Sequence, residues 1–209
     1  MRLSLLALAS VLAAGTSALH ADPFIPYSNA GHADSPSTIT FNGAPGTGIT
    51  AYFYSVSAAD TDTISIFDAT SGTFLSPQGV FNNQAPITVG STVTFTSPSL
   101  HNGDTLVFDL YNTSFPGDVF SSNPGTSPDG NSHAYFSAFS GTIGSFGTIN
   151  GTYVGMEDLP AGQSDWDYND DTFVFTSVNA APTPEPSTFA LLGTGLIGAA
   201  GALRRKFAR

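Results

Sequence analysis

The chain has 209 residues, which suits one domain with targeting segments, and its apolar content is ample for a packed core. It has no cysteine, which excludes disulfides, thiol nucleophiles and Cys-ligated zinc or iron–sulfur centres. All 5 Lys and Arg residues lie at the two ends, whereas all 16 Asp and Glu residues lie between Asp22 and Glu185. Because this acidic middle cannot neutralise phosphates, we expect no nucleic-acid binding.

The N-terminus has the parts of a secretory signal peptide. Arg2 gives a positive start, residues 3–14 form an apolar run, and small residues lead to Ala18 and Ala21. We predict that residues 1–21 are the signal peptide, with cleavage after Ala21. Cleavage after Ala18 is the alternative. The protein is therefore expected to be exported.

The body of the chain, residues 22–180, is predicted to consist of short strands separated by turns. Gly, Ser, Thr, Asn and Pro are abundant and favour turns, and no segment shows a sustained helical period. The expected strands are 37–41, 49–57, 63–67, 92–96, 105–111, 133–139, 151–156 and 172–178. This pattern predicts an all-β fold, an antiparallel β-sandwich of jelly-roll type, with a partly closed β-barrel as the alternative.

Acidic residues are concentrated near the end of the body. Six carboxylates lie between Glu157 and Asp171, and no Lys or Arg of the domain can balance them. Crowded carboxylates repel one another, and calcium, which takes about six to eight oxygen ligands, removes that repulsion. The candidate calcium ligands are Glu157, Asp158, Asp165, Asp167, Asn169, Asp170 and Asp171.

The spacing of this acidic segment also favours calcium. Four oxygen-bearing residues recur at every second position, namely Asp165, Asp167, Asn169 and Asp171. An extended loop would place their side chains on one side and the two aromatic residues between them against the core. The segment lacks the glycine and final glutamate of an EF-hand, zinc or copper would require His or Cys, and magnesium prefers fewer carboxylates. A solvated acidic turn that binds nothing is the alternative.

The segment from Tyr153 to Phe175 resembles a bacterial domain of unknown function. The shared signature reads G-apolar-E-D-L, a Gly-containing gap, S-D-x-D-aromatic-N-D and then an apolar strand, and the upstream Asp129-Gly130 and Ser132-His133 also fit. That domain occurs in secreted, PEP-anchored and adhesin-like proteins, and its acidic residues are similar to a calcium site. The resemblance implies this role for Glu157, Asp158, Asp165, Asp167, Asn169 and Asp170. The pattern usually has an apolar residue at the position of Asp171.

The C-terminus has three parts in a fixed order. We predict a Pro-rich extended spacer at 181–187, a membrane helix at 188–203 and a basic cytoplasmic tail at 204–209. At about 1.5 Å per residue the apolar run spans roughly 24 Å, a little less than a hydrocarbon core of about 30 Å. The residues that stand out are Pro184, Glu185 and Pro186 in the spacer and Arg204, Arg205 and Lys206 in the tail.

This tail resembles the PEP-CTERM sorting signal of Gram-negative bacteria. The resemblance implies processing by an exosortase-type membrane enzyme near the PEP motif and transient anchoring in the inner membrane. It further implies a final place at the cell surface or in the extracellular matrix, together with exopolysaccharide and biofilm. A plain C-terminal membrane anchor is the alternative.

The sequence indicates no enzyme. It has no G-x-S-x-G or H-E-x-x-H motif, and adjacent Glu157 and Asp158 would face opposite ways on a strand, unlike a glycosidase pair. We expect an exported, calcium-stabilised protein with a structural or adhesive role linked to exopolysaccharide or biofilm. The alternative is a calcium-dependent carbohydrate-binding module, and a glycan-active enzyme is the least favoured function. The aromatic residues available to stack on sugars are Tyr52, Tyr54, Tyr111, Tyr135, Phe120 and Trp166.

Overall fold

The computed structural model describes residues 27–182, which form strands, turns and loops without a helix. The predicted signal peptide (1–21), PEP residues (184–186), membrane helix (188–203) and basic tail (204–209) lie outside the described residues. Within the described range, nothing has the helical length and apolarity needed to cross a membrane.

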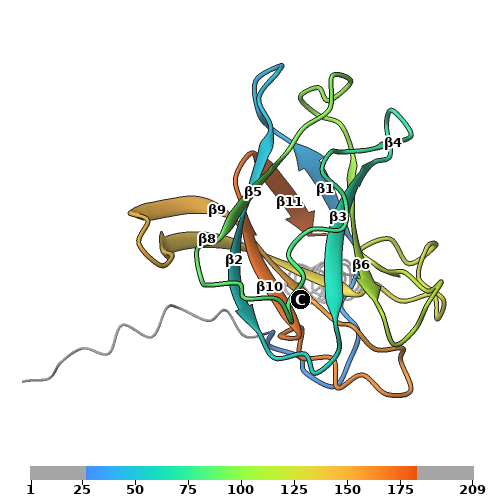
Figure 1. The fold of residues 1–209 in the computed structure, drawn as a ribbon. Helices are drawn as coiled ribbons and strands as arrows, with labels where there is room; N and C mark the ends of the chain where they lie inside the picture. Colours follow the sequence, from blue (N-terminus) through green and yellow to red (C-terminus); the bar gives the residue numbers. More distant parts are fainter. Residues whose placement is uncertain (1–26, 183–209) are drawn as a thin grey trace, which may run out of the picture.

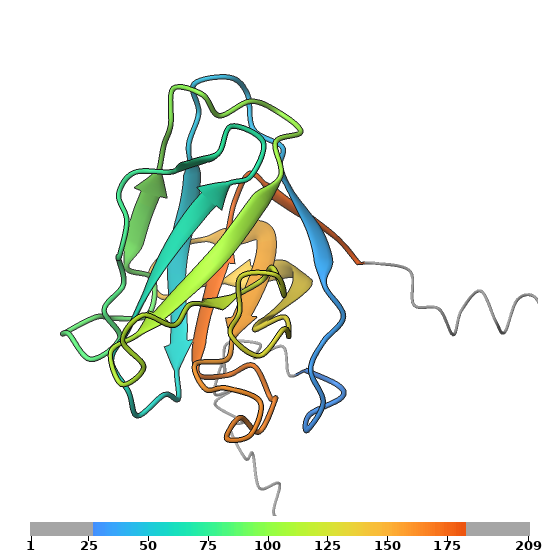
Figure 2. The same cartoon turned by 90° about the vertical axis from the view of Figure 1, so that its right-hand side faces the viewer.

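The strands form three antiparallel sheets (Figure 1). The five-stranded sheet has the order β5 (Thr92–Phe95), β2 (Ile49–Val56), β10 (Asp171–Phe175), β9 (Thr148–Met156) and β8 (Ala134–Thr142). The four-stranded sheet has the order β4 (Thr73–Phe74), β3 (Asp62–Asp68), β6 (Leu106–Asn112) and β7 (Phe120–Ser121). The third sheet pairs β1 (Ser37–Phe41) with β11 (Val178–Pro182). Figure 2 shows β1 and β11 together at one side of the molecule, where the described chain ends.

The two larger sheets face each other across the main apolar core. Phe108 of β6 meets Phe175 of β10 edge to face, with ring centroids 4.8 Å apart, and both side chains are fully buried. Because successive side chains of a strand point to opposite faces, Val174 lies on the other face of β10 and joins a second apolar cluster with Tyr54 and Tyr153. Each large apolar side chain buried in this way contributes roughly 1.5–3 kcal/mol to folding.

The fold is all-β and antiparallel, as the sequence predicted. The sheets form no closed barrel in the described part of the chain, and their strand order does not establish the jelly-roll topology. The eight predicted strands correspond to β1, β2, β3, β5, β6, β8, β9 and β10. The two-residue strands β4 and β7 were not predicted, because a strand that short has no periodicity to detect.

The strand expected at 172–178 is divided in two. β10 ends at Phe175, the backbone turns at Ser177 with a φ of +62°, and β11 begins at Val178. β11 then pairs with β1 as far as Pro182, past the boundary expected at 180. The Asn-Ala-Ala-Pro sequence has little strand propensity of its own, so pairing with β1 determines its conformation.

One end of the molecule gathers the segments that matter for the candidate site. The loop 157–170 connects β9 to β10 and lies at the lower end in Figure 1, beside the N-terminal segment. Gly31 N donates to Asp165 O at 2.9 Å, and Ser57 N donates to Asp170 O at 2.9 Å. The acidic loop is therefore fastened to the N-terminal segment and to the connection between β2 and β3.

Candidate metal centre

Two buried aromatic side chains hold the acidic loop against the sheets. Trp166 is 7 % exposed and Tyr168 is 1 % exposed. The Tyr168 hydroxyl donates to Ser132 O at 2.9 Å and accepts from Asp34 N at 2.6 Å. Both aromatic residues have left-handed backbones, with φ of +53° and +56°, so the loop is coiled rather than extended. The aromatic side chains thus face inward, as the alternation predicted, although by a different backbone path.

Three of the predicted ligands converge at this loop, and we call Glu157, Asp165 and Asp167 the loop site. One carboxylate oxygen from each lies within 4.8 Å of the other two. Glu157 is fully buried, Asp167 is half-buried and Asp165 is exposed. The loop site therefore runs from the core to the surface and is accessible to an ion from solvent. Its ligands are carboxylates only, which suits a hard cation such as calcium.

Glu157 is the most strongly perturbed carboxylate of the loop site. Its carboxylate accepts hydrogen bonds from Tyr168 N and from the Ser164 hydroxyl. Burial raises the pKa of Glu157 to about 7, although these two hydrogen bonds lower it and the negative charges of Asp170 and Asp165 raise it further. A bound divalent cation would reverse this preference for the protonated form, because it favours the charged carboxylate.

Asn169 orients Asp167 within the loop site. Its backbone N donates to Asp167 Oδ1 at 3.2 Å, and its side-chain amide donates to Oδ2 of the same carboxylate. Burial raises the pKa of Asp167 and the charge of Asp165 raises it further, whereas these hydrogen bonds from Asn169 lower it. In this structure Asn169 acts on a neighbouring carboxylate rather than on the centre of the site.

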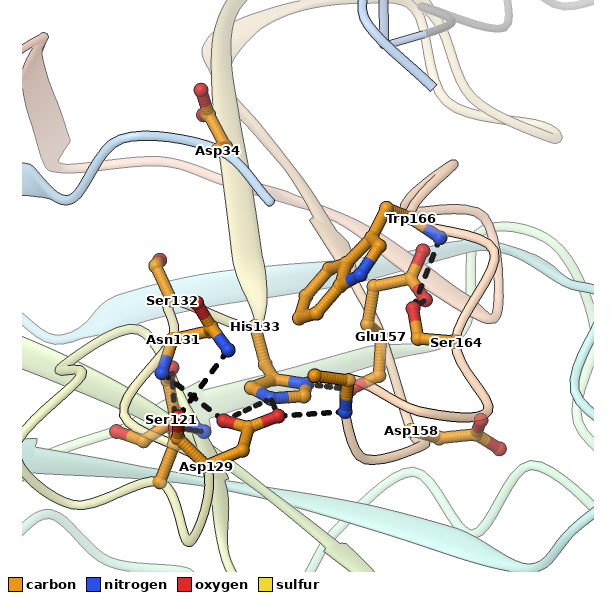
Figure 3. Close-up of polar contacts among 12 residues, drawn as sticks. Asp34, Ser121, Asp129, Asn131, Ser132, His133, Glu157, Asp158, Ser164 and Trp166 are labelled. Atoms are coloured by element: carbon orange, nitrogen blue, oxygen red, sulfur yellow. Dashed lines mark hydrogen bonds and ion pairs between the residues drawn. The ribbon is translucent and has the colours of Figure 1, made fainter. Parts of the chain in front are cut away.

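The other predicted ligands, Asp158, Asp170 and Asp171, lie beside the loop site and form a second group. Figure 3 shows Glu157 extending toward Ser164 and Trp166, whereas Asp158 points away from them. Asp171 begins β10 and is 1 % exposed, so it does not share one side of an extended loop with Asp165. The carboxylates of Asp158 and Asp171 instead lie against Asp62 of β3. Sequence spacing could not identify Asp62, because only the packing of the two sheets brings it here.

A half-buried aspartate, Asp129, and a buried histidine, His133, form a pair beside Glu157 of the loop site (Figure 3). His133 is fully buried between Phe120 and Trp166, with ring centroids 4.9 Å away on each side. Its Nε2 lies 3.1 Å from both oxygens of Asp129, and its Nδ1 lies 3.3 Å from Glu157 O. Burial lowers the pKa of His133, whereas the Asp129 carboxylate and Glu157 O act in the opposite direction. The resemblance signature included both residues, but their role in fixing the start of the loop is visible only in the structure.

Asp129 also holds the far side of the loop. Its Oδ2 accepts from Ala161 N at 2.8 Å, and its Oδ1 accepts from Asn131 N at 3.0 Å. Burial alone would raise the pKa of Asp129, but these hydrogen bonds and His133 outweigh it and lower the pKa. Asp129 therefore stays ionised and connects the loop, through His133, to the sheet beneath it.

Gly155 of β9 sets the distance between the loop and the sheet. A Cβ at this position would overlap the carbonyl oxygen of Tyr168. The absence of a side chain lets the loop backbone at Tyr168 lie directly on β9, near the end of the strand that leads into Glu157. A larger residue here would displace the loop site as a whole.

Comparison with known protein families identifies a PEP-CTERM protein-sorting motif at residues 182–206. The match confirms the predicted C-terminal signal and begins at Pro182, the last residue of β11. The motif implies an exported protein that is sorted and processed by an exosortase. No curated protein and no solved structure matched the chain. The family of the β-domain is not identified, so the resemblance of its acidic signature stays a prediction.

Proposed function

We propose that the chain is a protein of the cell surface or extracellular matrix whose β-domain is stabilised by calcium. Its role would be structural or adhesive and linked to exopolysaccharide or biofilm. The observation that carries the proposal is the sorting motif at 182–206, which begins at the last residue of β11. Export would bring the domain into a calcium-containing medium, and the carboxylates of the loop site would bind the calcium there.

The case for calcium rests on charge as well as on geometry. Residues 27–182 contain no Lys or Arg, so no permanently charged cationic side chain of the described domain can neutralise the loop site. A cation that binds only the folded protein stabilises it by about 2.7 kcal/mol at a concentration 100 times Kd. A weak site is therefore sufficient for an exported protein, because extracellular calcium is plentiful.

We propose a non-catalytic role for the domain. The Asp129–His133 pair has the composition of a catalytic dyad, but His133 is fully buried between two aromatic rings. A general base must come within hydrogen-bond reach of the proton that it removes. The carboxylates of Glu157 and Asp158 point apart, so they do not form a facing pair around a substrate either (Figure 3).

Carbohydrate binding is the alternative, and a polar groove favours it. The groove has a volume of about 560 Å³ and lies between β8, β9 and β11, with the amides of Asn42, Asn150 and Asn179 on its walls. Amide side chains suit the hydroxyl groups of a sugar. The predicted stacking residues do not line this groove, since Tyr54, Phe120 and Trp166 are buried and Tyr52, Tyr111 and Tyr135 are half-buried elsewhere.

Thermal unfolding of the full chain in mild detergent, with calcium and with chelator, tests the proposal. Saturating calcium should raise the Tm by roughly 5–10 °C, given about 2–4 °C per kcal/mol for a chain of this size. Asp167→Asn should remove most of that rise. Asp118→Asn, which changes an acid outside both acidic groups, is the matched control. Equal calcium responses of Asp167→Asn and wild type would contradict the loop site.

The alternative function requires a binding measurement. Retention of the chain on purified exopolysaccharide should be compared for wild type and Asn179→Ala, each with calcium and with chelator. Loss of retention in Asn179→Ala with an unchanged Tm would favour the carbohydrate-binding module. Retention that is absent from wild type under both conditions would exclude that alternative for the polysaccharide used.

A further inference from the structure

A small aromatic pocket lies on the outer face of the four-stranded sheet, away from the loop site. Phe67 of β3 and Phe74 of β4 face each other across the two strands, with ring centroids 5.0 Å apart. Figure 1 shows β4 toward the upper end of the domain, whereas the loop 157–170 lies at the lower end. The pocket, which we call the β4 pocket, has a volume of about 280 Å³ and is lined by Phe67, Ala69, Phe74, Val107, Asp109, Asn123 and Thr126.

The register of the strands explains why these side chains meet. Phe108 of β6 points into the main core, so Val107 and Asp109, on either side of it, point to the outer face. Antiparallel pairing places Val107 opposite Phe67, and Phe67 in turn opposite Phe74. The two aromatic rings and the carboxyl group therefore share one face across three neighbouring strands.

Asp109 is the acidic group of the β4 pocket. It is 3 % exposed, and the Ser121 hydroxyl donates to its Oδ1 at 2.6 Å. The other oxygen, Oδ2, accepts no hydrogen bond within residues 27–182, although the side chain lines the pocket. Burial raises the pKa of Asp109, whereas the hydrogen bond from Ser121 lowers it. One oxygen of a buried carboxyl group is therefore left for a ligand.

The chemistry of the β4 pocket suits a cation that also carries hydroxyl groups. Residues 27–182 contain no Lys or Arg, so an ammonium group that pairs with Asp109 must come from outside these residues. Ammonium groups are attracted to the faces of aromatic rings as well as to carboxylates. Asn123 Oδ1 accepts from Gly125 N at 3.0 Å, which leaves the NH₂ of this amide to donate to a hydroxyl group.

We propose that the β4 pocket binds a cationic amino sugar, with its ring against Phe67 and Phe74 and its ammonium group against Asp109. The inference rests on the proposed role linked to exopolysaccharide, and it names the sugar unit and the place where it binds. The volume is near the lower end of the range for small-ligand pockets, about 300–1,000 Å³, which suits one sugar ring. The net charge of −11 attracts cations and repels acidic sugars.

The β4 pocket differs from the two sites described above. It shares no lining residue with the groove between β8, β9 and β11. It also contains none of the loop-site carboxylates, so amino-sugar binding should be the same with calcium and with chelator. These differences allow the pocket to be tested separately from the calcium site.

Calorimetric titration of two oligosaccharides into the full chain, in mild detergent at pH 6, tests the proposal. The probe is the glucosamine tetramer, whose amino groups are protonated. Its neutral counterpart is the N-acetylglucosamine tetramer, which has the same sugar ring without the charge. Wild type should bind the glucosamine tetramer roughly tenfold more tightly, because only this probe offers an ammonium group to Asp109 and the aromatic rings.

Two variants and two matched controls assign the binding to the β4 pocket. Asp109→Asn, which can still accept from Ser121, should lose the preference for the glucosamine tetramer. Phe74→Ala should weaken its binding roughly tenfold. Asp118→Asn removes the same charge outside the pocket, and Phe146→Ala removes a ring that is 39 % exposed, against 38 % for Phe74. Both controls should bind as wild type does.

Four results would overturn the β4 pocket: equal binding of the two tetramers by wild type, unchanged binding in Phe74→Ala, equal losses in Asp109→Asn and Asp118→Asn, or a tetralysine peptide that binds as tightly as the glucosamine tetramer. Equal losses would show non-specific attraction to an acidic protein, and the peptide result would assign the pocket to cationic peptides. If Asp109→Asn fails to fold, Phe74→Ala decides, because its ring is exposed. The expected sugar binding in a chain whose Tm does not respond to calcium would support the pocket and refute the loop site alone.

Discussion

Raising the pH should destabilise the calcium-free protein, and Glu157 allows part of this effect to be calculated. Burial raises the folded-state pKa of Glu157 from 4.5 to about 7. The folded protein therefore holds a proton that the unfolded chain has released, so this stabilisation is complete below pH 4.5 and is lost as the pH rises through 7. The shift corresponds to about 3 kcal/mol, and hence to a fall in Tm of roughly 6–12 °C.

The assay is a series of thermal melts between pH 5 and pH 8 in chelator. The variant Glu157→Gln keeps the shape of the protonated side chain, and the Ser164 hydroxyl can accept from its amide. It should therefore lose the Glu157 part of the pH dependence, while Asp118→Asn should behave as wild type. Asp62 of β3 should add to the wild-type slope in the same direction, because burial raises its pKa to about 6.

Saturating calcium should reverse the trend in wild type, because an ion binds ionised carboxylates and competes with protons. The reasoning would be refuted if calcium-free wild type were more stable at pH 8 than at pH 5. It would also fail if Glu157→Gln kept the full wild-type slope.

Three further changes test the supports of the loop site. Gly155→Ala should destabilise the protein by about 2 kcal/mol or more and should weaken calcium binding, because the new Cβ overlaps Tyr168 O. The matched control is Gly162→Ala, where the new Cβ has open space. In thermal melts and calcium titrations this control should match wild type. Asp129→Ala should lower the free energy of unfolding, measured in denaturant, by about 1–3 kcal/mol, because it leaves the buried His133 Nε2 without its partner. A decrease no larger than that of Asp118→Ala would contradict this. Trp166→Phe should reduce the luminescence of terbium bound in place of calcium at the loop site, where Tyr168 remains as a weaker sensitiser, while the number of calcium ions stays constant. An unchanged signal would show that terbium binds elsewhere.

Local sequence patterns predicted the parts of the fold that depend on local chemistry. The alternation in Thr172–Phe175 identified a central strand, and the structure buries both of its faces. The last strand was extended incorrectly through Ser177, because the turn there depends on a left-handed backbone that serine rarely adopts. β11 could not be predicted from propensity, since its conformation depends on pairing with β1, far away in the chain.

The acidic segment shows the same limit. Glu157, Asp165 and Asp167 were recognised as candidates because they follow one another in a single loop. Asp171 was placed with them by a period of two, but the left-handed residues Trp166 and Tyr168 interrupt that period. Asp62 carried no local signal, because an acid at the start of a strand is ordinary until another sheet covers it.

The pairing of β1 with β11 has a mechanical consequence. A surface anchor attached through the sorting motif would pull on the chain at Pro182, where Ser37 is the paired residue. β11 pairs with β1 alone, so tension would enter this small sheet before it reached the two larger ones. Farther along, Thr152 Oγ1 donates to Val178 O at 2.8 Å and Asn42 N donates to Ser177 O at 3.0 Å. Under flow, the strand would peel from its end toward these two bonds, lengthening the tether while the end of the domain that carries the loop site stayed folded.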